Sequence, residues 1–457
     1  MLNHYLINII SFLPIYYLMD LRINPISESL NGEIVAPGSK SYSHRAFIVA
    51  SLADGISVIK NPLVDGDVKI TIEILRLLGV KILRIDDENS YIVENPNNFY
   101  KSLNKTLDCK NSGTSLRIFT ALGLIINGGV TLTGDFLRKN RPILPLLEAL
   151  KSLGGKFKLT EEKIEIKRNK SRCNIVKIPG DISSQFISAL LIVCPLIKCK
   201  SNDFIKIELT SPLISVPYVK MTIDVLNAFG INIQVNFEAG EFYISNDQNY
   251  RAQEFAVPGD FSSSSFIIAA AVLSNYNAKI IVNNLSTNNI QGDRSIIRIL
   301  KRMGADIEFK EIQKQVIVNG GRAKNPLKGI EIDCSDIPDL FPILSVVGAF
   351  ASGKTVIYNA KNLRLKESDR ISSMARELNK MGVRIKEEDD RLTIYHCQKL
   401  NGSVINHDND HRIAMACTIA ALFASSNSYV ENIDIVKDSY PTFLDDLQKI
   451  GIQLDLK

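Results

Sequence analysis

The sequence predicts an α/β protein with two domains, each built from three copies of one repeated unit. Two features recur six times, at intervals of roughly 70 to 80 residues, and such a period is typical of repeat architectures. The first feature is a polar or Gly-rich turn that opens an apolar helix, and it begins at Gly38, Asn111, Gly180, Gly259, Ser335 and Asp408. The second is a glycine that ends an amphipathic helix and precedes a strand, at Gly79, Gly154, Gly230, Gly304, Gly382 and Gly451. Glycine readily adopts the positive φ that the residue just past a helix needs.

Each unit reads as strand, helix, strand, helix, strand, with room for a further strand. The first helix of each unit is apolar on all sides, so a single unit could barely bury it. Six units can bury these helices if the helices cluster inside and the sheets lie outside, which favours two domains of three units. We place the crossovers between the domains near Gly38 and Pro258.

Composition narrows the class of protein. The chain has 457 residues, of which 45% are hydrophobic and 23% charged, and its net charge is +5. These values are typical of a globular protein, and the small positive excess is compatible with a site for small anionic substrates. The seven cysteines show no CxxC spacing and the five histidines form no metal-ligand pattern, so we expect reduced thiols, a cytoplasmic location and no metal site.

The first 18 residues differ from the rest of the chain. Tyr5 to Leu18 is apolar but is interrupted by Pro14, and no basic segment precedes it. It is also shorter than the roughly 20 residues that span a bilayer. We therefore expect residues 1–18 to be a leader outside the fold, with Met19 as the natural first residue.

The turns that open the first helices hold the candidate site residues. Backbone N–H groups at a helix start attract phosphate and carboxylate, and basic side chains add formal charge. One such turn alone is more often a capped helix start, but basic turns in four of six units favour a site for several anions. Lys366 and Arg370 would share a helix face if residues 362–370 are helical, and an anion would relieve their repulsion. The candidates are Lys40, Ser41, Arg45, Gly113, Arg141, Ser183, Ser184, Gln185, Asp339, Asn362, Lys366, Glu367, Arg370 and Arg412.

Seven motifs resemble those of one family and follow the family's order over about residues 21–455. They are PGSKSYSHRA from Pro37, NSGTSLR from Asn111, LRKNRP from Leu137, GDISSQF from Gly180, DIPDL from Asp336, NLRLKESDR from Asn362 and NDHR from Asn409. Together they are highly specific, and singly only the first and the sixth are. The family that they resemble is 5-enolpyruvylshikimate-3-phosphate (EPSP) synthase.

The resemblance implies an inside-out α/β barrel, the enolpyruvyl transferase fold, with two domains of three βαβαββ units. One domain would combine residues 19–37 with 258–457, and the other would be residues 38–257. The implied reaction transfers the enolpyruvyl group of phosphoenolpyruvate to the 5-hydroxyl of shikimate 3-phosphate and releases phosphate. The implied partners are these two small molecules alone, without cofactor, metal, nucleic acid or membrane, and we expect a monomer.

The resemblance also implies a role for each candidate residue. Shikimate 3-phosphate would be held by Lys40, Ser41, Arg45, Ser183, Ser184, Gln185, Ser215, Asp339, Asn362 and Lys366, with Tyr218 as a further candidate. Phosphoenolpyruvate would be held by Lys40, Gly113, Arg141, Gln185, Arg370 and Arg412. In the catalytic set of Lys40, Asp339 and Glu367, Asp339 would take the 5-hydroxyl proton and Glu367 would exchange protons with the methylene carbon.

The chain departs from the family's pattern at one position. The family carries a lysine directly before a Ser/Thr-aromatic-Pro segment near its C-terminus, where it meets phosphoenolpyruvate, and Asp438 stands there in this chain. Lys437 is one residue earlier, and in a strand one step turns a side chain to the other face. Either a local bulge lets Lys437 serve, or phosphoenolpyruvate binds more weakly.

Three alternatives compete with this interpretation. The sister enolpyruvyl transferases, which act on UDP-N-acetylglucosamine, use a cysteine in the loop before their Arg-Pro, and the loop from Gly134 to Pro142 contains none. A non-catalytic anion-binding repeat protein would not need both Asp339 and Glu367, although Asp438 weakly favours it. A nucleic-acid binder is disfavoured because aromatic residues make up only 7% of the chain and tryptophan is absent.

Overall fold

The strands form six four-stranded sheets that share one topology. The structure is a computed structural model that describes residues 19–85, 89–96, 100–101, 105–139, 141–170, 175–198, 204–286 and 288–456, so the predicted leader lies outside the described residues. In each sheet the two strands at one edge pair parallel, and the other two pairings across the sheet are antiparallel. The predicted repeat is confirmed, and the described strands remain six separate sheets without closing into one barrel.

Within each sheet the strands follow one another in space in a fixed order. Three sheets are β14 (Glu254–Ala256), β3 (Ile56–Lys60), β5 (Ser90–Glu94) and β4 (Lys81–Ile85); β6 (Thr106–Asp108), β7 (Val130–Thr133), β9 (Lys163–Arg168) and β8 (Gly155–Leu159); and β10 (Ile175–Ile178), β11 (Phe204–Leu209), β13 (Glu241–Ser245) and β12 (Ile233–Asn236). The other three are β2 (Asn31–Val35), β15 (Ala278–Asn283), β17 (Gln315–Gly320) and β16 (Asp306–Lys310); β18 (Glu331–Asp333), β19 (Lys354–Tyr358), β21 (Arg391–Tyr395) and β20 (Ile385–Glu388); and β22 (Val404–Ile405), β23 (Ser428–Val430), β1 (Leu21–Ile23) and β24 (Asp455–Leu456).

The first helix of every unit is almost entirely buried, as its apolar sequence predicts. Every residue of three of these helices is buried, and four serines lie within one of them, at residues 262–265. Such helices are stable only when neighbouring elements cover all their faces. They are α1 (Lys40–Ala50), α3 (Gly113–Leu122), α6 (Ser184–Val193), α8 (Phe261–Leu273), α10 (Phe341–Phe350) and α12 (His411–Leu422).

The second helix of every unit is amphipathic and ends at one of the predicted glycines. All six glycines have φ between 84° and 111°, so the prediction from the sequence is confirmed. In the fourth of these helices Ile296, Leu300 and Met303 are buried while Arg298 and Arg302 are exposed. They are α2 (Gly66–Leu77), α5 (Leu144–Ser152), α7 (Val216–Ala228), α9 (Ser295–Met303), α11 (Arg370–Lys380) and α13 (Phe443–Lys449), and a short further helix is α4 (Asp135–Arg138).

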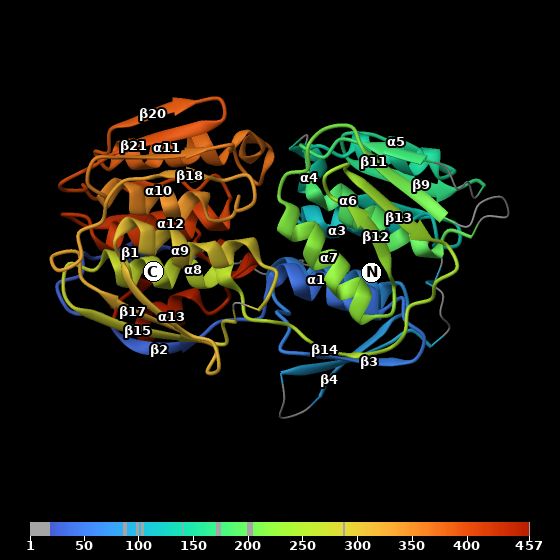
Figure 1. The fold of residues 1–457 in the computed structure, drawn as a ribbon, viewed down its shortest axis with the longest axis horizontal. Coiled ribbons are helices and arrows are strands. Elements are labelled where there is room, and N and C mark those ends of the chain that lie inside the picture. Colours follow the sequence, from blue (N-terminus) through green and yellow to red (C-terminus); the bar gives the residue numbers. More distant parts are fainter. Residues whose placement is uncertain are drawn as a thin grey trace, which may run out of the picture.

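The helices and sheets form two lobes, each with its own hydrophobic core (Figure 1). We name the lobe with core residues 42–257 the middle lobe, and the lobe with core residues 21–36 and 261–452 the terminal lobe. Figure 1 shows α1, α3 and α6 inside the middle lobe and α8, α10 and α12 inside the terminal lobe, with strands towards the outside. None of the described helices is long and apolar enough to cross a membrane.

Two strands pair in one lobe and lead into a helix of the other. β2 pairs with β15 in the terminal lobe and leads into α1, whereas β14 pairs with β3 in the middle lobe and leads into α8. The two passages lie side by side, because the Ser39 amide donates to the Pro258 carbonyl (2.9 Å) and the Asp260 amide donates to the Pro37 carbonyl (2.8 Å). These paired passages fix the start of α1 at the boundary between the lobes.

Because the first helix of each unit is buried and the second is partly exposed, a Leu→Ala substitution should destabilise the protein more in a first helix than at an exposed position of a second helix. Leu190 of α6 is 0% exposed, so Leu190→Ala should lower the free energy of unfolding by about 2–5 kcal/mol. Leu77 of α2 is 44% exposed, so Leu77→Ala should cost less than about 1 kcal/mol. Urea denaturation measures both, and equal losses would contradict the assignment of α6 to the core.

Candidate active site

All residues predicted for the site from the sequence line one cleft between the two lobes. The cleft encloses a cavity of about 70 Å³. From the middle lobe come Lys40, Ser41, Arg45, Gly113, Arg141, Ser183, Ser184, Gln185, Ser215 and Tyr218, and from the terminal lobe come Asp339, Asn362, Lys366, Glu367, Arg370 and Arg412. Segments separated by up to 372 positions, from Lys40 to Arg412, therefore meet at one place.

The cleft is built on the starts of buried helices, as the repeat predicts. Ser112 caps α3 by accepting from the Ser115 amide, and Ser183 caps α6 by accepting from the Gln185 amide. In the terminal lobe Asp410 caps α12 by accepting from the Arg412 amide. Side chains at these starts are held by the caps, and the helix ends add partial positive charge to the cleft.

Arg370 is the cation of the cleft that binds the most carboxylates. Its Nε donates to Asp410 Oδ2 (2.8 Å), its Nη1 donates to Asp339 Oδ1 (2.8 Å) and its Nη2 donates to Glu367 Oε2 (2.9 Å). The side chain of Arg370 is 1% exposed and that of Asp410 is 0% exposed. Burial alone would lower the pKa of Arg370, but the carboxylates of Asp410, Glu367 and Asp339 raise it well above its ordinary value.

The two predicted catalytic carboxylates each face further cations. Arg412 Nη2 lies 3.1 Å from Asp339 Oδ2, which also accepts a hydrogen bond from the Tyr218 hydroxyl (2.6 Å). Burial alone would raise the pKa of Asp339, but Arg412 and Arg370 hold it well below its ordinary value.

Glu367 shows the same pattern with a cation of the opposite lobe. Its Oε1 pairs with Arg141 Nη2 (3.3 Å), which joins the terminal lobe to the middle lobe. Burial alone would raise the pKa of Glu367, but Arg141 and Arg370 hold it well below its ordinary value. Both carboxyl groups are therefore ionised at neutral pH in this arrangement.

Two lysines of the cleft differ in their partners. Lys40 Nζ pairs with Asp67 Oδ2 (3.2 Å), and although burial lowers the pKa of Lys40, Asp67 brings the net shift above the ordinary value. Lys366 has no such close partner within the described part of the chain, and burial lowers its pKa to about 8. Lys366 is therefore the cleft cation whose charge is most sensitive to pH near neutrality.

Several buried nitrogen atoms of the cleft lack a hydrogen-bond partner. Arg141 Nε and Nη1, Arg412 Nη1, Arg117 Nε and His411 Nε2 are buried without a partner among the described residues. Leaving a buried polar group unpaired costs about 1–3 kcal/mol, and more when it is charged. Since Arg141 and Arg412 line the cavity from opposite lobes, an anion between them would satisfy these donors.

The cleft also contains residues that the sequence analysis did not assign to the site. Arg117 donates from Nη1 to Gln185 Oε1 and from Nη2 to the Pro142 carbonyl (2.9 Å), and it lies over the rings of Phe136 and Phe186. Because Arg117 belongs to the NSGTSLR motif that begins at Asn111, the sequence could have assigned it to the site. Asp67 and His411 also line the cavity. His411 belongs to the NDHR motif, whereas Asp67 is an acid in the first turn of a helix, which is too common to indicate a site.

The condition under which Lys366 and Arg370 would share a helix face is not met. Residues 362–370 do not form one helix, because a 3₁₀ helix, η3 (Lys361–Leu365), ends before α11 begins at Arg370. Arg370 and Lys366 therefore do not share a helix face, and carboxylates offset the charge of Arg370.

The structure also excludes one of the two alternatives left open for Lys437. Residues 433–438 form a 3₁₀ helix, η4 (Ile433–Asp438), instead of a strand. Lys437 Nζ pairs with Asp434 Oδ1 (2.5 Å) on the same element, and its side chain is 52% exposed. Lys437 does not line the cleft, so no bulge brings it to the site.

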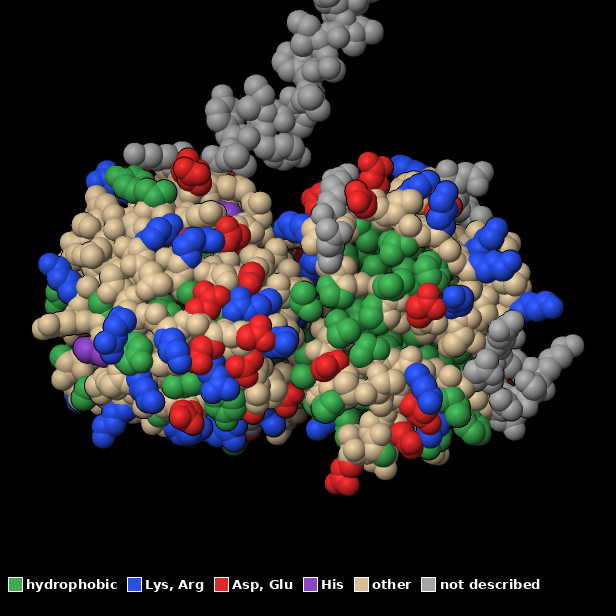
Figure 2. Space-filling view, turned by 90° about the horizontal axis from the view of Figure 1, so that it is seen from above, with side chains coloured by type: hydrophobic (Ala, Val, Ile, Leu, Met, Phe, Trp, Pro, Cys, Tyr) green, Lys and Arg blue, Asp and Glu red, His purple; other side chains and the backbone are tan. Residues whose placement is uncertain are grey.

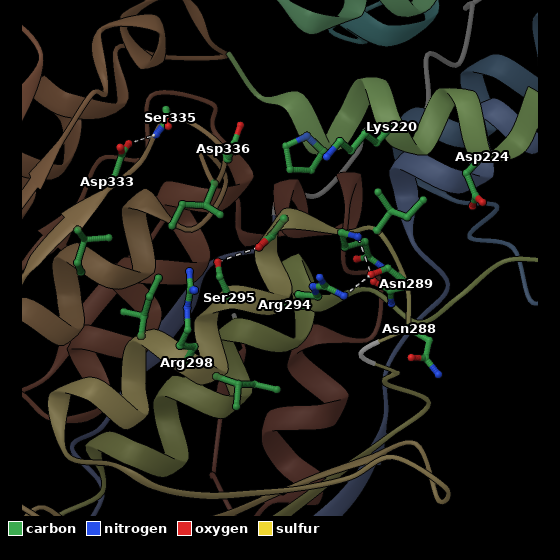
Figure 3. Close-up of a pocket in the computed structure, with 18 of the residues that line it drawn as sticks. Lys220, Asp224, Asn288, Asn289, Arg294, Ser295, Arg298, Asp333, Ser335 and Asp336 are labelled. Carbon is green, nitrogen blue, oxygen red and sulfur yellow. Dashed lines mark hydrogen bonds between the residues drawn. The ribbon is translucent and has the colours of Figure 1, made fainter. Parts of the chain in front are cut away.

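A larger groove of about 1420 Å³ lies elsewhere on the boundary between the lobes (Figure 3). It is bordered by α7, by η2 (Gly292–Arg294) and by α9, and Figure 3 shows Lys220, Arg294 and Arg298 around it. These cations are exposed, so water screens them more strongly than the buried cations of the cleft. None of the residues predicted for the site lines this groove.

The molecular surface adds no competing site for a polyanion on the face shown in Figure 2. There, Lys and Arg side chains are interspersed with Asp and Glu over the lobe on the left, and hydrophobic side chains cover part of the lobe on the right. The described residues form no continuous basic stripe on this face, although such a stripe is typical of nucleic-acid binding. No group of three or more His, Cys, Asp or Glu within the described ranges is placed to hold a metal ion.

Comparison with known proteins identifies the family. The family model for EPSP synthase (3-phosphoshikimate 1-carboxyvinyltransferase) matches residues 25–447. The 3-phosphoshikimate 1-carboxyvinyltransferase of Methanocaldococcus jannaschii is 43% identical over 446 residues, covering 96% of this chain and 100% of that protein. The corresponding protein of Methanococcus maripaludis is 42% identical over 434 residues, covering 93% and 98%.

Solved structures show the same fold. An EPSP synthase structure from Acinetobacter baumannii superposes with a TM-score of 0.79 at 24% identity, covering 96% of this chain and 100% of that one. The enolpyruvyl transferase NikO from Streptomyces tendae superposes with a TM-score of 0.78 at 18% identity, covering 96% and 99%. The α/β fold with two sets of three units is thus that of the enolpyruvyl transferases, and the chain belongs to the EPSP synthase family, whose reaction is the enolpyruvyl transfer of the shikimate pathway.

Proposed function

We propose that the cleft between the lobes transfers the enolpyruvyl group of phosphoenolpyruvate to the 5-hydroxyl of shikimate 3-phosphate. The observation that carries this proposal is the pair of carboxylates, Asp339 and Glu367, held by three arginines, two of which, Arg141 and Arg412, keep buried N–H groups without an acceptor. The carboxylates provide an acid and a base, and the unsatisfied guanidinium groups provide sites for two anions.

The two substrates would occupy different sides of the cleft. Shikimate 3-phosphate would lie against Ser183, Ser184 and Arg45, whose guanidinium is fixed by Thr222 Oγ1 (2.7 Å) and by the Ser41 and Tyr218 carbonyls. The remaining contacts to this substrate would come from Lys40, Ser41, Gln185, Ser215, Asn362 and Lys366. Phosphoenolpyruvate would lie against Arg141, Arg370 and Arg412, with further contacts from Lys40, Gly113 and Gln185.

Each carboxylate would move one proton in each half of the reaction. Asp339 takes the proton of the 5-hydroxyl as its oxygen bonds to C2 of phosphoenolpyruvate, and Glu367 delivers a proton to the methylene carbon. In the second half the tetrahedral intermediate loses a proton from the new methyl group to Glu367, and the C2–O bond to phosphate breaks while Asp339 returns the hydroxyl proton to the departing phosphate oxygen. Proton balance requires that Glu367 be protonated before addition, and Lys40 would stabilise the charge that develops on the phosphate.

Substrate binding would adjust both carboxyl groups to these tasks. Arg141, Arg370 and Arg412 hold the pKa of Asp339 and Glu367 low while they pair with the two carboxylates. An anionic substrate competes with the carboxylates for these guanidinium groups and adds negative charge beside them. Both effects raise the pKa of the carboxyl groups, which makes Asp339 a stronger base and lets Glu367 take up a proton.

The lobes must separate for the substrates to enter. The cavity of about 70 Å³ is smaller than the roughly 300 Å³ of the smallest common ligand pockets. Two contacts that cross the cleft, Arg141 to Glu367 and Tyr218 to Asp339, would break as the lobes part. The lobes would then close over the substrates and exclude water.

We propose the two lobes as domains, with boundaries of 19–37 plus 258–457 and 38–257. The separate cores and the paired passages at residues 37–39 and 258–260 support this division. The five described cysteines, at positions 109, 194, 334, 397 and 417, are free thiols, which supports the proposed cytoplasmic location. A monomeric state and a reaction without cofactor or metal stay predictions.

The first prediction concerns the reaction itself. Protein supplied with phosphoenolpyruvate should release phosphate with shikimate 3-phosphate and not with UDP-N-acetylglucosamine. Lys40→Met and Glu367→Gln should each lower kcat by about 10²–10⁴-fold, because each removes a group from the reacting centre. Lys361→Met, at a side chain that is 76% exposed, is the matched control and should leave the rate unchanged. Full activity of Glu367→Gln would contradict the proposed role of this residue.

The second prediction concerns Lys366 and pH. Its pKa of about 8 means that the ammonium is charged below this pH and loses its charge as pH rises through 8. The KM for shikimate 3-phosphate should therefore rise above pH 8, and Lys366→Arg should flatten this rise because a guanidinium stays charged. Steady-state kinetics from pH 6.5 to 9.5 measure the effect, with Lys361→Arg as the control. An unchanged rise in Lys366→Arg would rule out Lys366 as its source.

A further inference from the structure

Asp438 lies where the backbones of the two lobes touch. The N-terminus of α2 in the middle lobe meets the end of η4 in the terminal lobe, and no side chain separates them. A Cβ atom on Gly66 would come within 2.5 Å of the Asp438 Cα and 2.6 Å of its carbonyl oxygen. Asp438 therefore belongs to a contact between the lobes that would break as they part in the proposed opening.

The carboxylate of Asp438 is left without a direct partner at this contact. Within the part of the chain that the structure describes, it accepts no hydrogen bond and forms no ion pair with a cation. The ammonium of Lys40, the nearby cation, is already paired with Asp67. On its own element, Lys437 is paired with Asp434.

The charges that face Asp438 are mostly negative. Asp67 comes from α2, Glu367 from the segment before α11 and Asp410 from the start of α12, while Lys40 of α1 opposes them. Burial and the charge of Asp67 raise the pKa of Asp438 to about 7. The group thus changes its charge near neutral pH, beside the lysine and glutamate proposed to act on phosphoenolpyruvate.

We propose that Asp438 sets the affinity of the cleft for phosphoenolpyruvate, binding being tight when its carboxyl is neutral and weak when it is ionised. This inference rests on the proposed function. An ionised carboxylate repels an anionic substrate held by Lys40 and Arg141, and it also disfavours closure by placing a second negative charge beside Asp67. Phosphoenolpyruvate would therefore bind together with a proton.

The direction of the pH effect follows from linkage. Binding an anion raises the pKa of Asp438 above about 7, so the complex holds more protons than the free protein at pH 7 to 8. The affinity is then full below the pKa of the free protein and falls as pH rises towards the pKa of the complex. If the pKa of the group fell on binding, the affinity would instead rise with pH.

The test compares the wild-type protein with Asp438→Asn, which keeps the shape of the side chain and removes its charge. The KM for phosphoenolpyruvate is measured from pH 6 to 8 at saturating shikimate 3-phosphate. The ratio of wild-type to variant KM should rise about five- to tenfold over this range. Taking the ratio cancels the ionisation of the substrate itself. Asp434→Asn removes a charge from the same 3₁₀ helix at a half-buried position outside the cleft and should leave the ratio flat.

A second measurement needs no turnover. Calorimetric titration of phosphoenolpyruvate in two buffers of different ionisation enthalpy should show greater proton uptake at pH 7.5 by the wild-type protein than by Asp438→Asn. A flat KM ratio together with equal proton uptake would overturn the inference about Asp438. Absence of phosphate release from the wild-type protein would instead overturn the proposed function, while the calorimetric comparison would still test Asp438.

Discussion

The guanidinium of Arg370 is the charge around which the cleft is organised. It is buried, and it is held by three carboxylates that come from three segments of the terminal lobe, Asp339 before α10, Glu367 before α11 and Asp410 at the start of α12. A buried charge that loses its partner costs several kcal/mol, so these three helix starts are held in fixed relative positions. The same contacts hold Asp339 and Glu367 at neighbouring positions of one cavity, on Nη1 and Nη2 of the same guanidinium, where one can act as a base and the other as an acid.

The remaining cations of the cleft are only partly satisfied, and this incompleteness is what suits them to bind substrates. Arg141 and Arg412 each pair with one of the two carboxylates yet keep buried N–H groups without an acceptor. Donors that are fixed in advance and shielded from water stabilise an incoming anion without reorganising. The cleft therefore contains buried hydrogen-bond donors that phosphate and carboxylate groups of a substrate can satisfy. In the proposed mechanism, substrate binding and adjustment of the catalytic carboxyl groups are the same event.

The repeat and the location of the site could be predicted from sequence, because both depend on short-range patterns. Apolar first helices and a glycine after each second helix are local signals, and polar turns before the helices mark where the site lies. What depended on tertiary packing was missed or mistaken. The acid at Asp67 looks like any first-turn acid until α2 is placed beside Lys40. The local pattern around Lys437 and Asp438 suggests a strand, but this segment forms a 3₁₀ helix with Ile433 and Val436 buried.

The most direct test of the proposed mechanism is a crystal structure with shikimate 3-phosphate and inorganic phosphate bound. The Nε and Nη1 groups of Arg141 and the Nη1 group of Arg412 should donate to oxygens of the bound phosphate. The distance from Arg141 Nη2 to Glu367 Oε1 should also increase from 3.3 Å as the anion takes over the guanidinium. Phosphate bound away from Arg141 and Arg412, with their ion pairs to Glu367 and Asp339 intact, would contradict the mechanism.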